Sequence, residues 1–443
     1  MKQTMTLLLL TGAFFFSPLA KAQEDGPVRI ESAEQKQVID SVSRRLLDNY
    51  VFPDVAKKMS DLLQENYKKG AYKTTVSVAT FAEKLTEDLR SVSKDKHLRV
   101  GFNPRLVKEL RSSAQSGDSD DVPAASLENM RMSNFGFKEI KLIEGNVGYL
   151  DLRGFVDTRF GGETAVAAMN FLSNASALII DLRNNGGGSP SMIQLITSYL
   201  YGAEPVHLNN FYFRPANQNT QSWTLPYVQG KRRPDIPVYV LTSKKTFSAA
   251  EEFTYNLKNL KRATIVGETT GGGAHPGGTM PATDRFTVWV PTGRAINPVT
   301  NTNWEGVGVK PDIDVKADEA LLTAHVKALE SLVAKSAGTA RQRYEWELLS
   351  LQSKKEPVQV AEATLKTYVG TYGEKRIVWE EGGLYFFPFP DMKVKLKPLT
   401  KEVFELSDIS NVRLQLLTEN NTVVGIAELF NNGRMDKHLK KAF

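Results

Sequence analysis

Residues 241–253, LTSKKTFSAAEEF, contain a serine in a setting that suits nucleophilic catalysis. A β-rich run ends near Ser243, and a helical pattern begins near Ser248. The hydroxyl of a serine at such a junction lies at the positive end of the helix dipole. The N–H of Ala249 would point the same way and supply half of an oxyanion hole. The same residues also fit a plain helix cap, because serine is a favoured N-cap residue.

A second segment, DLRNNGGGSP at residues 181–190, has three consecutive glycines between a buried strand and a helix. Glycine permits a tight turn that presents backbone N–H groups, here those of Gly186 and Gly187, at the start of a helix. The segment fits neither a phosphate-binding loop nor a dinucleotide fingerprint, since both of their glycine patterns are absent. An ordinary strand-to-helix turn is the alternative.

A serine nucleophile needs a base, and two histidines lie in suggestive settings. His97 lies in DKHLRV, where a helical block ends, and His275 lies in the glycine-rich segment GGGAHPGG. The spacing alone does not choose between them. The chain has no cysteine, which excludes a thiol nucleophile. Its five histidines form no paired ligand motif, so we expect neither a metal nor a cofactor.

The elements that must position these residues fall into blocks. Apolar residues recur at helical spacing through residues 30–98, and a polar, turn-rich stretch follows. Nearly continuous apolar runs then alternate with helical patterns, which is typical of a sheet covered on both faces. Six short β-rich runs end the chain. We predict these ranges: signal peptide 1–22, helical domain 23–103, linker or flap 104–133, α/β core 134–341, connector 342–364 and small antiparallel β domain 365–443.

Charge and composition narrow the class of protein. The net charge is +6, with no basic run interleaved with aromatic residues, so we expect no nucleic-acid partner. Residues 7–16 form an apolar run after Lys2, and Ala20-Lys21-Ala22 fits a signal-peptidase site. We therefore expect export to the periplasm or outside the cell, with cleavage near Ala22. No later run is long enough to span a bilayer, so we expect no membrane span.

The two glycine- and serine-containing segments together resemble motifs of the tail-specific, or C-terminal-processing, serine peptidases. The segments RATIVGETTGGG at 262–273 and WEGVGVKPDIDV at 304–315 follow in that family's order. The resemblance implies a crotonase-like, or Clp-protease-like, α/β core and a peptide or protein substrate. Many relatives insert a PDZ domain after the helical block, but residues 103–133 are too few for one. The C-terminal β domain lies outside the resemblance.

This family has two catalytic designs. One is a Ser–Lys dyad, whose lysine would fall in the glycine-rich segment where this chain has Gly273. The other branch resembles the tricorn core protease and interphotoreceptor retinoid-binding protein, and its catalytic members use Ser, His and Glu. That resemblance implies Ser248 as nucleophile, His97 as base and then acid, and Glu305 as the carboxylate that orients His97.

The residue beside His97 and the oxyanion donors complete the resemblance-based assignment of the site. In the tricorn core protease a serine next to the histidine also assists, and the residue before His97 in this chain is Lys96. Backbone N–H groups of Gly186 or Gly187 and of Ala249 would form the oxyanion hole. The competing reading is a weakly active or inactive module that binds apolar ligands or peptides on the same fold. A cytoplasmic acyl-CoA enzyme is a third reading, which the signal peptide opposes.

Overall fold

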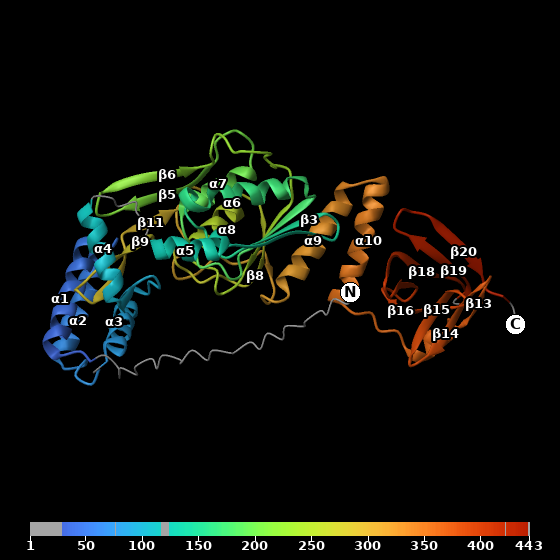
Figure 1. Cartoon of the computed structure of the whole chain (residues 1–443), viewed down its shortest axis with the longest axis horizontal. Helices are drawn as coiled ribbons and strands as arrows, with labels where there is room; N and C mark the ends of the chain where they lie inside the picture. The colour runs from blue at the N-terminus through green and yellow to red at the C-terminus, as the bar shows by residue number, and fades with distance from the viewer. Residues whose placement is uncertain (1–28, 76, 117–123, 421, 442–443) are drawn as a thin grey trace, which may run out of the picture.

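The computed structural model describes residues 29–75, 77–116, 124–420 and 422–441. They form a helical domain, an α/β core and a C-terminal β domain, which lie in a row along the molecule (Figure 1). The predicted signal peptide lies outside the described residues. Within the described residues, no helix is both long and apolar enough to cross a membrane.

The helical domain consists of α1 (Ser32–Asn49), α2 (Pro53–Lys68) and α3 (Val78–Ser93). The apolar positions at helical spacing, such as Val38, Val42 and Leu46, are fully buried. Ser77 caps α3 by accepting a hydrogen bond from the N–H of Thr80.

This domain shares its hydrophobic core with a hairpin of the α/β core. Strand β1 (Arg99–Phe102) pairs with β10 (Phe286–Pro291), which also pairs with β9 (Gly277–Pro281). Phe286, Val288 and Val290 pack in one cluster with the buried faces of α1, α2 and α3. The segment immediately before β1 is therefore fixed against the core.

Residues 104–133, predicted as a linker or flap, contain two helices in their described part. These are α4 (Pro104–Ser116) and α5 (Ala124–Met132). Val107 of α4 is buried, and Leu106 lines a large cleft. The described residues between β1 and β2 thus hold helices and no strand, which is not the content of a PDZ domain.

The α/β core is built on a mixed six-stranded sheet in the order β12-β8-β7-β4-β3-β2. Its five parallel strands pair with the antiparallel β2 at one edge. The strands are β2 (Phe137–Ile143), β3 (Val147–Leu152), β4 (Ala177–Asp181), β7 (Val238–Thr242), β8 (Thr264–Gly267) and β12 (Ile313–Asp314). Burial of every residue in β3, β4 and β7 explains their continuous apolar sequences.

Helices cover both faces of this sheet. One face packs against α6 (Thr158–Phe171), α7 (Pro190–Tyr199) and α8 (Ala249–Asn259). The other face packs against α9 (Ala320–Lys335) and α10 (Gly338–Lys355). A separate sheet of β6 (Gln218–Trp223), β5 (His207–Phe213) and β11 (Gly293–Ile296) flanks the core.

After α11 (Glu362–Thr367), the C-terminal domain is an eight-stranded antiparallel sheet in chain order. Its first and last strands also meet, through hydrogen bonds from Gly373 N–H to the Leu439 carbonyl and from Lys441 N–H to the Thr371 carbonyl. The strands are β13 (Gly370–Tyr372), β14 (Lys375–Glu380), β15 (Gly383–Phe389), β16 (Met392–Pro398), β17 (Val403–Leu406), β18 (Ile409–Glu419), β19 (Thr422–Phe430) and β20 (Met435–Leu439).

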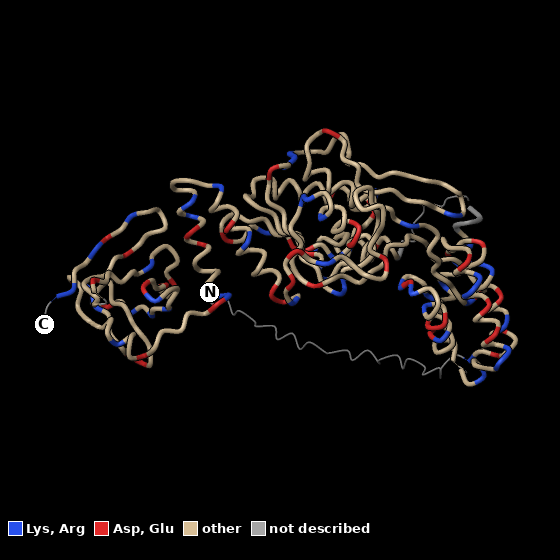
Figure 2. The backbone as a smooth tube through the Cα atoms, turned by 180° about the vertical axis from the view of Figure 1, so that it is seen from behind, with Lys and Arg blue, Asp and Glu red and all other residues tan. Residues whose placement is uncertain are grey.

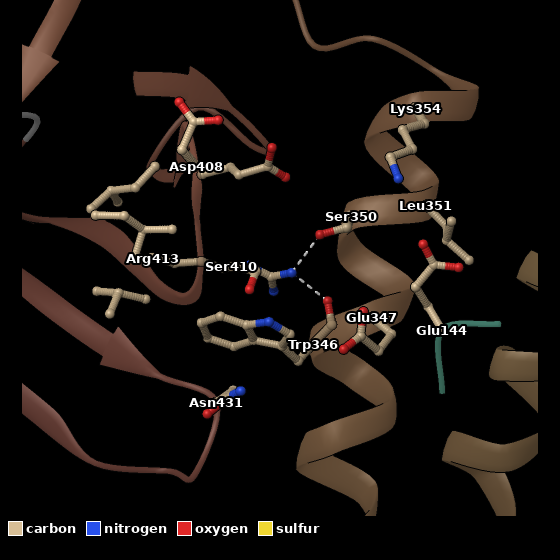
Figure 3. A pocket seen from close by; sticks show the side chains of 14 residues that line it. Glu144, Trp346, Glu347, Ser350, Leu351, Lys354, Asp408, Ser410, Arg413 and Asn431 are labelled. Atoms are coloured by element: carbon tan, nitrogen blue, oxygen red, sulfur yellow. Dashed lines mark hydrogen bonds between the residues drawn. The ribbon is translucent and has the colours of Figure 1, made fainter. Parts of the chain in front are cut away.

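A buried arginine joins this domain to α10. The guanidinium of Arg413 lies 3.8 Å from the centre of the Trp346 ring and donates to the Ser350 hydroxyl at 2.6 Å and to the Trp346 carbonyl at 2.5 Å (Figure 3). Burial lowers the pKa of Arg413 to about 10. These contacts line a cavity of about 430 Å³ between α10 and strands β17 and β18.

Figure 2 shows charges of both signs interspersed along the helical domain and the C-terminal domain. This mixture agrees with the small net charge of +6. The predicted fold class, a helical N-terminal region, an α/β core and a C-terminal antiparallel β domain, is confirmed.

Candidate active site

Ser248 lies at the junction between β7 and α8, as the sequence predicts. Its φ of 56° is in the left-handed region, which is strained for a residue with a side chain. The backbone N–H of Ser248 donates to Glu251 Oε2 at 2.9 Å, which holds this conformation. The serine is thus a helix cap in a strained conformation, at the positive end of α8.

Glu251 is a fully buried carboxylate that holds the segment beneath Ser248. Besides the Ser248 N–H, it accepts hydrogen bonds from the N–H groups of Gly272 and Gly273 at 2.6 and 2.8 Å and from the Thr270 hydroxyl. Burial raises the pKa of Glu251, and these donors partly offset the rise. Its role in this geometry is positioning, because it fixes the turn and the glycine-rich segment together.

The glycine turn packs directly against the serine. Gly187 has a φ of +111°, and a Cβ at this position would lie 2.8 Å from the Cβ of Ser248. Gly188 has a φ of +141°, and its Cβ would lie 2.1 Å from the Phe155 carbonyl oxygen. Both positions therefore require glycine for their conformation and for the close approach of the backbone.

The N–H groups around Ser248 differ in their availability. The Gly187 N–H donates to Asn185 Oδ1 at 2.9 Å, so it is engaged within the turn. Among the described residues, the N–H groups of Gly186 and Ala249 donate to no protein acceptor. Gly186 lines the same cleft as Ser248. The geometry thus favours Gly186 and Ala249 as the oxyanion donors.

His97 lies across this cleft, between the end of α3 and β1. Its ring stacks on Trp289 at 4.8 Å and lies 4.6 Å from the Phe247 ring, measured between ring centres. The side chain is 9% exposed, and both ring nitrogens lack a hydrogen-bond partner. His97 and Ser248 line one cleft of about 810 Å³, and no hydrogen bond joins them in this structure.

Asp95, two residues before His97, is a carboxylate that sequence reasoning did not single out. Its Oδ1 accepts the His97 backbone N–H at 3.0 Å and lies 3.7 Å from His97 Nδ1. Its Oδ2 lies 2.8 Å from His275 Nδ1 and accepts from the Tyr50 hydroxyl at 3.4 Å. Burial raises the pKa of Asp95, but hydrogen bonds from His275 and His97 outweigh it and hold the pKa at about 2.

Glu305 lies next to this group of side chains. Its Oε2 accepts the Ala274 N–H at 2.6 Å and is 3.4 Å from His275 Nδ1, while its Oε1 has no hydrogen-bond partner. Burial, followed by repulsion from Asp95, raises the pKa of Glu305. The structure therefore brings both candidate histidines and two carboxylates together, with Glu305 in contact with His275 and Asp95 nearer to His97.

Ligand atoms of Asp95, His275 and Glu305 all lie within 4.8 Å of one another. Such a donor set could hold a divalent cation, but the 2.8 Å contact between His275 and Asp95 already involves two of the three ligands. The contacts of His275 with Asp95 and Glu305 explain why the three side chains lie together.

Gly273 bears on the choice between the two catalytic designs. A Cβ at this position would lie 2.3 Å from the Phe247 ring and 2.7 Å from His97 Cε1. The place of a lysine side chain is thus taken by the two rings. Trp304 Nε1 donates to the Gly273 carbonyl at 2.8 Å and anchors the segment. A histidine from the helical domain occupies the space that a lysine at 273 would need.

Two family models match the chain. The model described as peptidase family S41 matches residues 146–315. The model described as the N-terminal domain of peptidase S41 in eukaryotic IRBP matches residues 22–134. The two models thus cover the segments that carry both Ser248 and His97.

Several solved structures are similar to parts of this chain. A photosystem II D1 C-terminal processing protease is 15% identical, with 65% of this chain and 94% of that chain covered and a TM-score of 0.42. A peptidase from Parabacteroides merdae is 19% identical, with coverage of 64% and 90% and a TM-score of 0.45. The tricorn protease is 14% identical, with coverage of 66% and 35% and a TM-score of 0.38.

Proposed function

We propose that this chain is an exported serine peptidase that cleaves peptides or protein tails through an acyl-enzyme, because the model of peptidase family S41 matches residues 146–315 and that of its N-terminal domain matches residues 22–134. The observation that carries the catalytic proposal is the shared cleft. Ser248, strained at the start of α8, and His97, with two unpaired ring nitrogens, both line it.

The chemistry follows from these positions. Ser248 Oγ attacks the substrate carbonyl carbon as His97 takes the hydroxyl proton. The N–H groups of Gly186 and Ala249 stabilise the oxyanion, which then collapses as His97 gives its proton to the leaving amine. A water molecule, activated by the same base, then hydrolyses the ester to release the acid and free Ser248.

Two carboxylates support His97 in this mechanism. Asp95 is the nearest carboxylate and compensates the positive charge that the ring acquires. Glu305 has an unpaired Oε1, and His97 has an unpaired Nδ1, so closure around a substrate can join them and complete the Ser248–His97–Glu305 triad. Asp95 is thus a positioning residue in this proposal, and Glu305 keeps its role as orienting carboxylate.

Labelling with a fluorophosphonate probe, followed by intact-mass measurement, tests the catalytic proposal. We expect one adduct on the purified protein, its loss in Ser248→Ala, and a rate at least 100-fold lower in His97→Ala. Ser189→Ala is a matched control, because Ser189 also caps a core helix, α7. An unlabelled wild-type protein that is folded and binds a peptide would instead support the binding-module reading, which the missing Ser248–His97 hydrogen bond favours.

Export is tested separately. We expect the mature protein to begin at Gln23, since the predicted cleavage site is Ala20-Lys21-Ala22. N-terminal peptide mapping of the protein from the periplasm or culture medium measures this. A mature protein that retains Lys2 would contradict the proposed export.

A further inference from the structure

A second, smaller cavity opens beside Ser248. Its volume is about 190 Å³, and it meets the large cleft at Ser248, Gly188 and Trp289. Apolar side chains form most of its wall: Phe211, Ala249, Pro276, Trp289, Ala295 and Trp304. A cavity of this form next to the nucleophile can receive one substrate side chain while the carbonyl lies at Ser248.

Besides Ser248, the polar side chain of Glu252 lines this apolar cavity. Glu252 follows Ser248 by four residues in α8, so it lies one turn further along the same helix face. It is only 4% exposed, and its Oε1 has no hydrogen-bond partner. The amides of Asn209 and Asn256 lie near enough to lower the pKa of Glu252, yet their Nδ2 atoms also lack hydrogen-bond partners.

A buried carboxyl group with an unpaired oxygen is unfavourable for folding alone. Burial raises the pKa of Glu252 to about 7, because the apolar surroundings solvate its charge poorly. No ion pair involving Glu252 occurs among the described residues. A leucine or glutamine would fill the position at lower cost, so the acid points to a ligand that brings the missing donor.

The size and shape of the cavity define that ligand. Its volume of about 190 Å³ suits a single substrate side chain. A lysine side chain has four carbons that suit the apolar wall and a terminal ammonium that can donate to Glu252. An arginine side chain is larger, and a short aliphatic side chain leaves Glu252 unpaired.

We propose that this cavity is the pocket for the substrate residue whose carbonyl Ser248 attacks, and that Glu252 is its specificity-determining residue, selecting lysine. The inference rests on the proposed peptidase function, and it names the substrate class of that site. Glu252 acts on the ground state and the transition state through the side chain of the substrate, without taking part in proton transfer at the scissile bond.

The test compares two peptide substrates that differ only at this residue, one with lysine and one with norleucine, which has a stem of similar length and no charge. We expect kcat/KM for lysine to exceed that for norleucine by at least tenfold at pH 8. In Glu252→Gln the ratio should fall to about 1 or below, while cleavage of the norleucine peptide is retained. Glu163→Gln, on the exposed surface of α6, is the control for a lost negative charge.

A binding measurement separates this inference from the peptidase proposal. Calorimetry on Ser248→Ala measures the affinity for peptides that end in lysine or norleucine, and it requires no turnover. A lysine preference that disappears in the Ser248→Ala/Glu252→Gln double variant supports the pocket even if the protein hydrolyses nothing. Equal affinity for the two peptides, or a preference that survives Glu252→Gln, overturns it.

Discussion

Replacement of Asp95 by asparagine tests how the base is supported. The substitution keeps the shape of the side chain and an oxygen that can accept the His97 N–H, but it removes the negative charge. Asp95 Oδ1 lies 3.7 Å from His97 Nδ1. At an effective dielectric constant near 20, opposite charges at this distance attract by about 4 kcal/mol. This is the interaction that a protonated His97 would lose in the transition state.

A loss of about 4 kcal/mol corresponds to roughly a thousandfold lower rate. We therefore expect Asp95→Asn to lower kcat/KM, and the rate of fluorophosphonate labelling, by about 10³. The affinity for a non-hydrolysed peptide should change little, because Asp95 does not line the cleft. Parallel measurements on Glu305→Gln show whether the closed triad adds a comparable contribution from Glu305.

The same substitution also affects stability, so the assay needs a folding control. Hydrogen bonds hold the pKa of Asp95 at about 2, below its ordinary value of 3.8. A lowered pKa stabilises the fold above about pH 4, and this contribution of about 2 kcal/mol is lost as the pH falls from 4 to 2. Asp88→Asn is the matched control, since Asp88 is a buried carboxylate of the same domain that accepts from Tyr72 at 2.7 Å.

The two variants should thus have similar melting temperatures and very different rates. If Asp95→Asn remains folded and loses less than tenfold in labelling rate, the charge of Asp95 does not support the base. If Asp88→Asn loses as much activity as Asp95→Asn, the effect comes from the stability of the domain and not from the site.

Four further outcomes follow from the structure. In Gly187→Ala, the new Cβ would lie 2.8 Å from the Cβ of Ser248, so the labelling rate should fall at least 100-fold. An unchanged labelling rate would contradict this packing. Glu251→Gln should lower the free energy of unfolding by about 2–3 kcal/mol in urea titration, since a neutral amide cannot accept all four donors; a change below 0.5 kcal/mol would be inconsistent with that role. The free energy of unfolding of the wild-type protein should fall by about 3 kcal/mol from pH 4.5 to 7, because the raised pKa of Glu252 means that the folded state favours its protonated form. Glu252→Gln should lack this pH dependence. Arg413→Met should expose the C-terminal domain to proteolysis near α10 without changing the labelling rate, and identical digestion patterns would refute its role as a clamp.

Much of the α/β core follows from local sequence. The apolar runs at 177–181 and 238–242 form central strands because both of their faces are covered. The position of Ser248 at a strand-to-helix junction is predictable, because the spacing of apolar residues changes there from the strand period to the helix period. The helices in 104–133 were missed because that stretch is polar and rich in turn-forming residues, so its apolar face is short. The amphipathic pattern of α4, with buried Val107, was the available signal.

The surroundings of His97 could not be read from the sequence. Asp95 and His275 are 180 residues apart, and their contact depends on the pairing of β1 with β10. Glu252 lies in the first turn of α8, where an acidic residue is favourable to the helix dipole. Its burial against an apolar cavity depends on how Phe211 and Trp304 pack over α8, which is a property of the tertiary structure. In each case the residue type is evident from the sequence, but the side chains that it contacts are not.

The alternation of β10 explains why the base comes from the helical domain. Phe286, Val288 and Val290 face the helices and join their hydrophobic core. Thr287 and Trp289 face the opposite side and line the cleft, where Trp289 stacks on His97. One strand therefore binds the helical domain with one face and positions its histidine with the other. Because the two functions share a strand, separation of the helical domain from the core would expose the apolar face and remove the base in the same step.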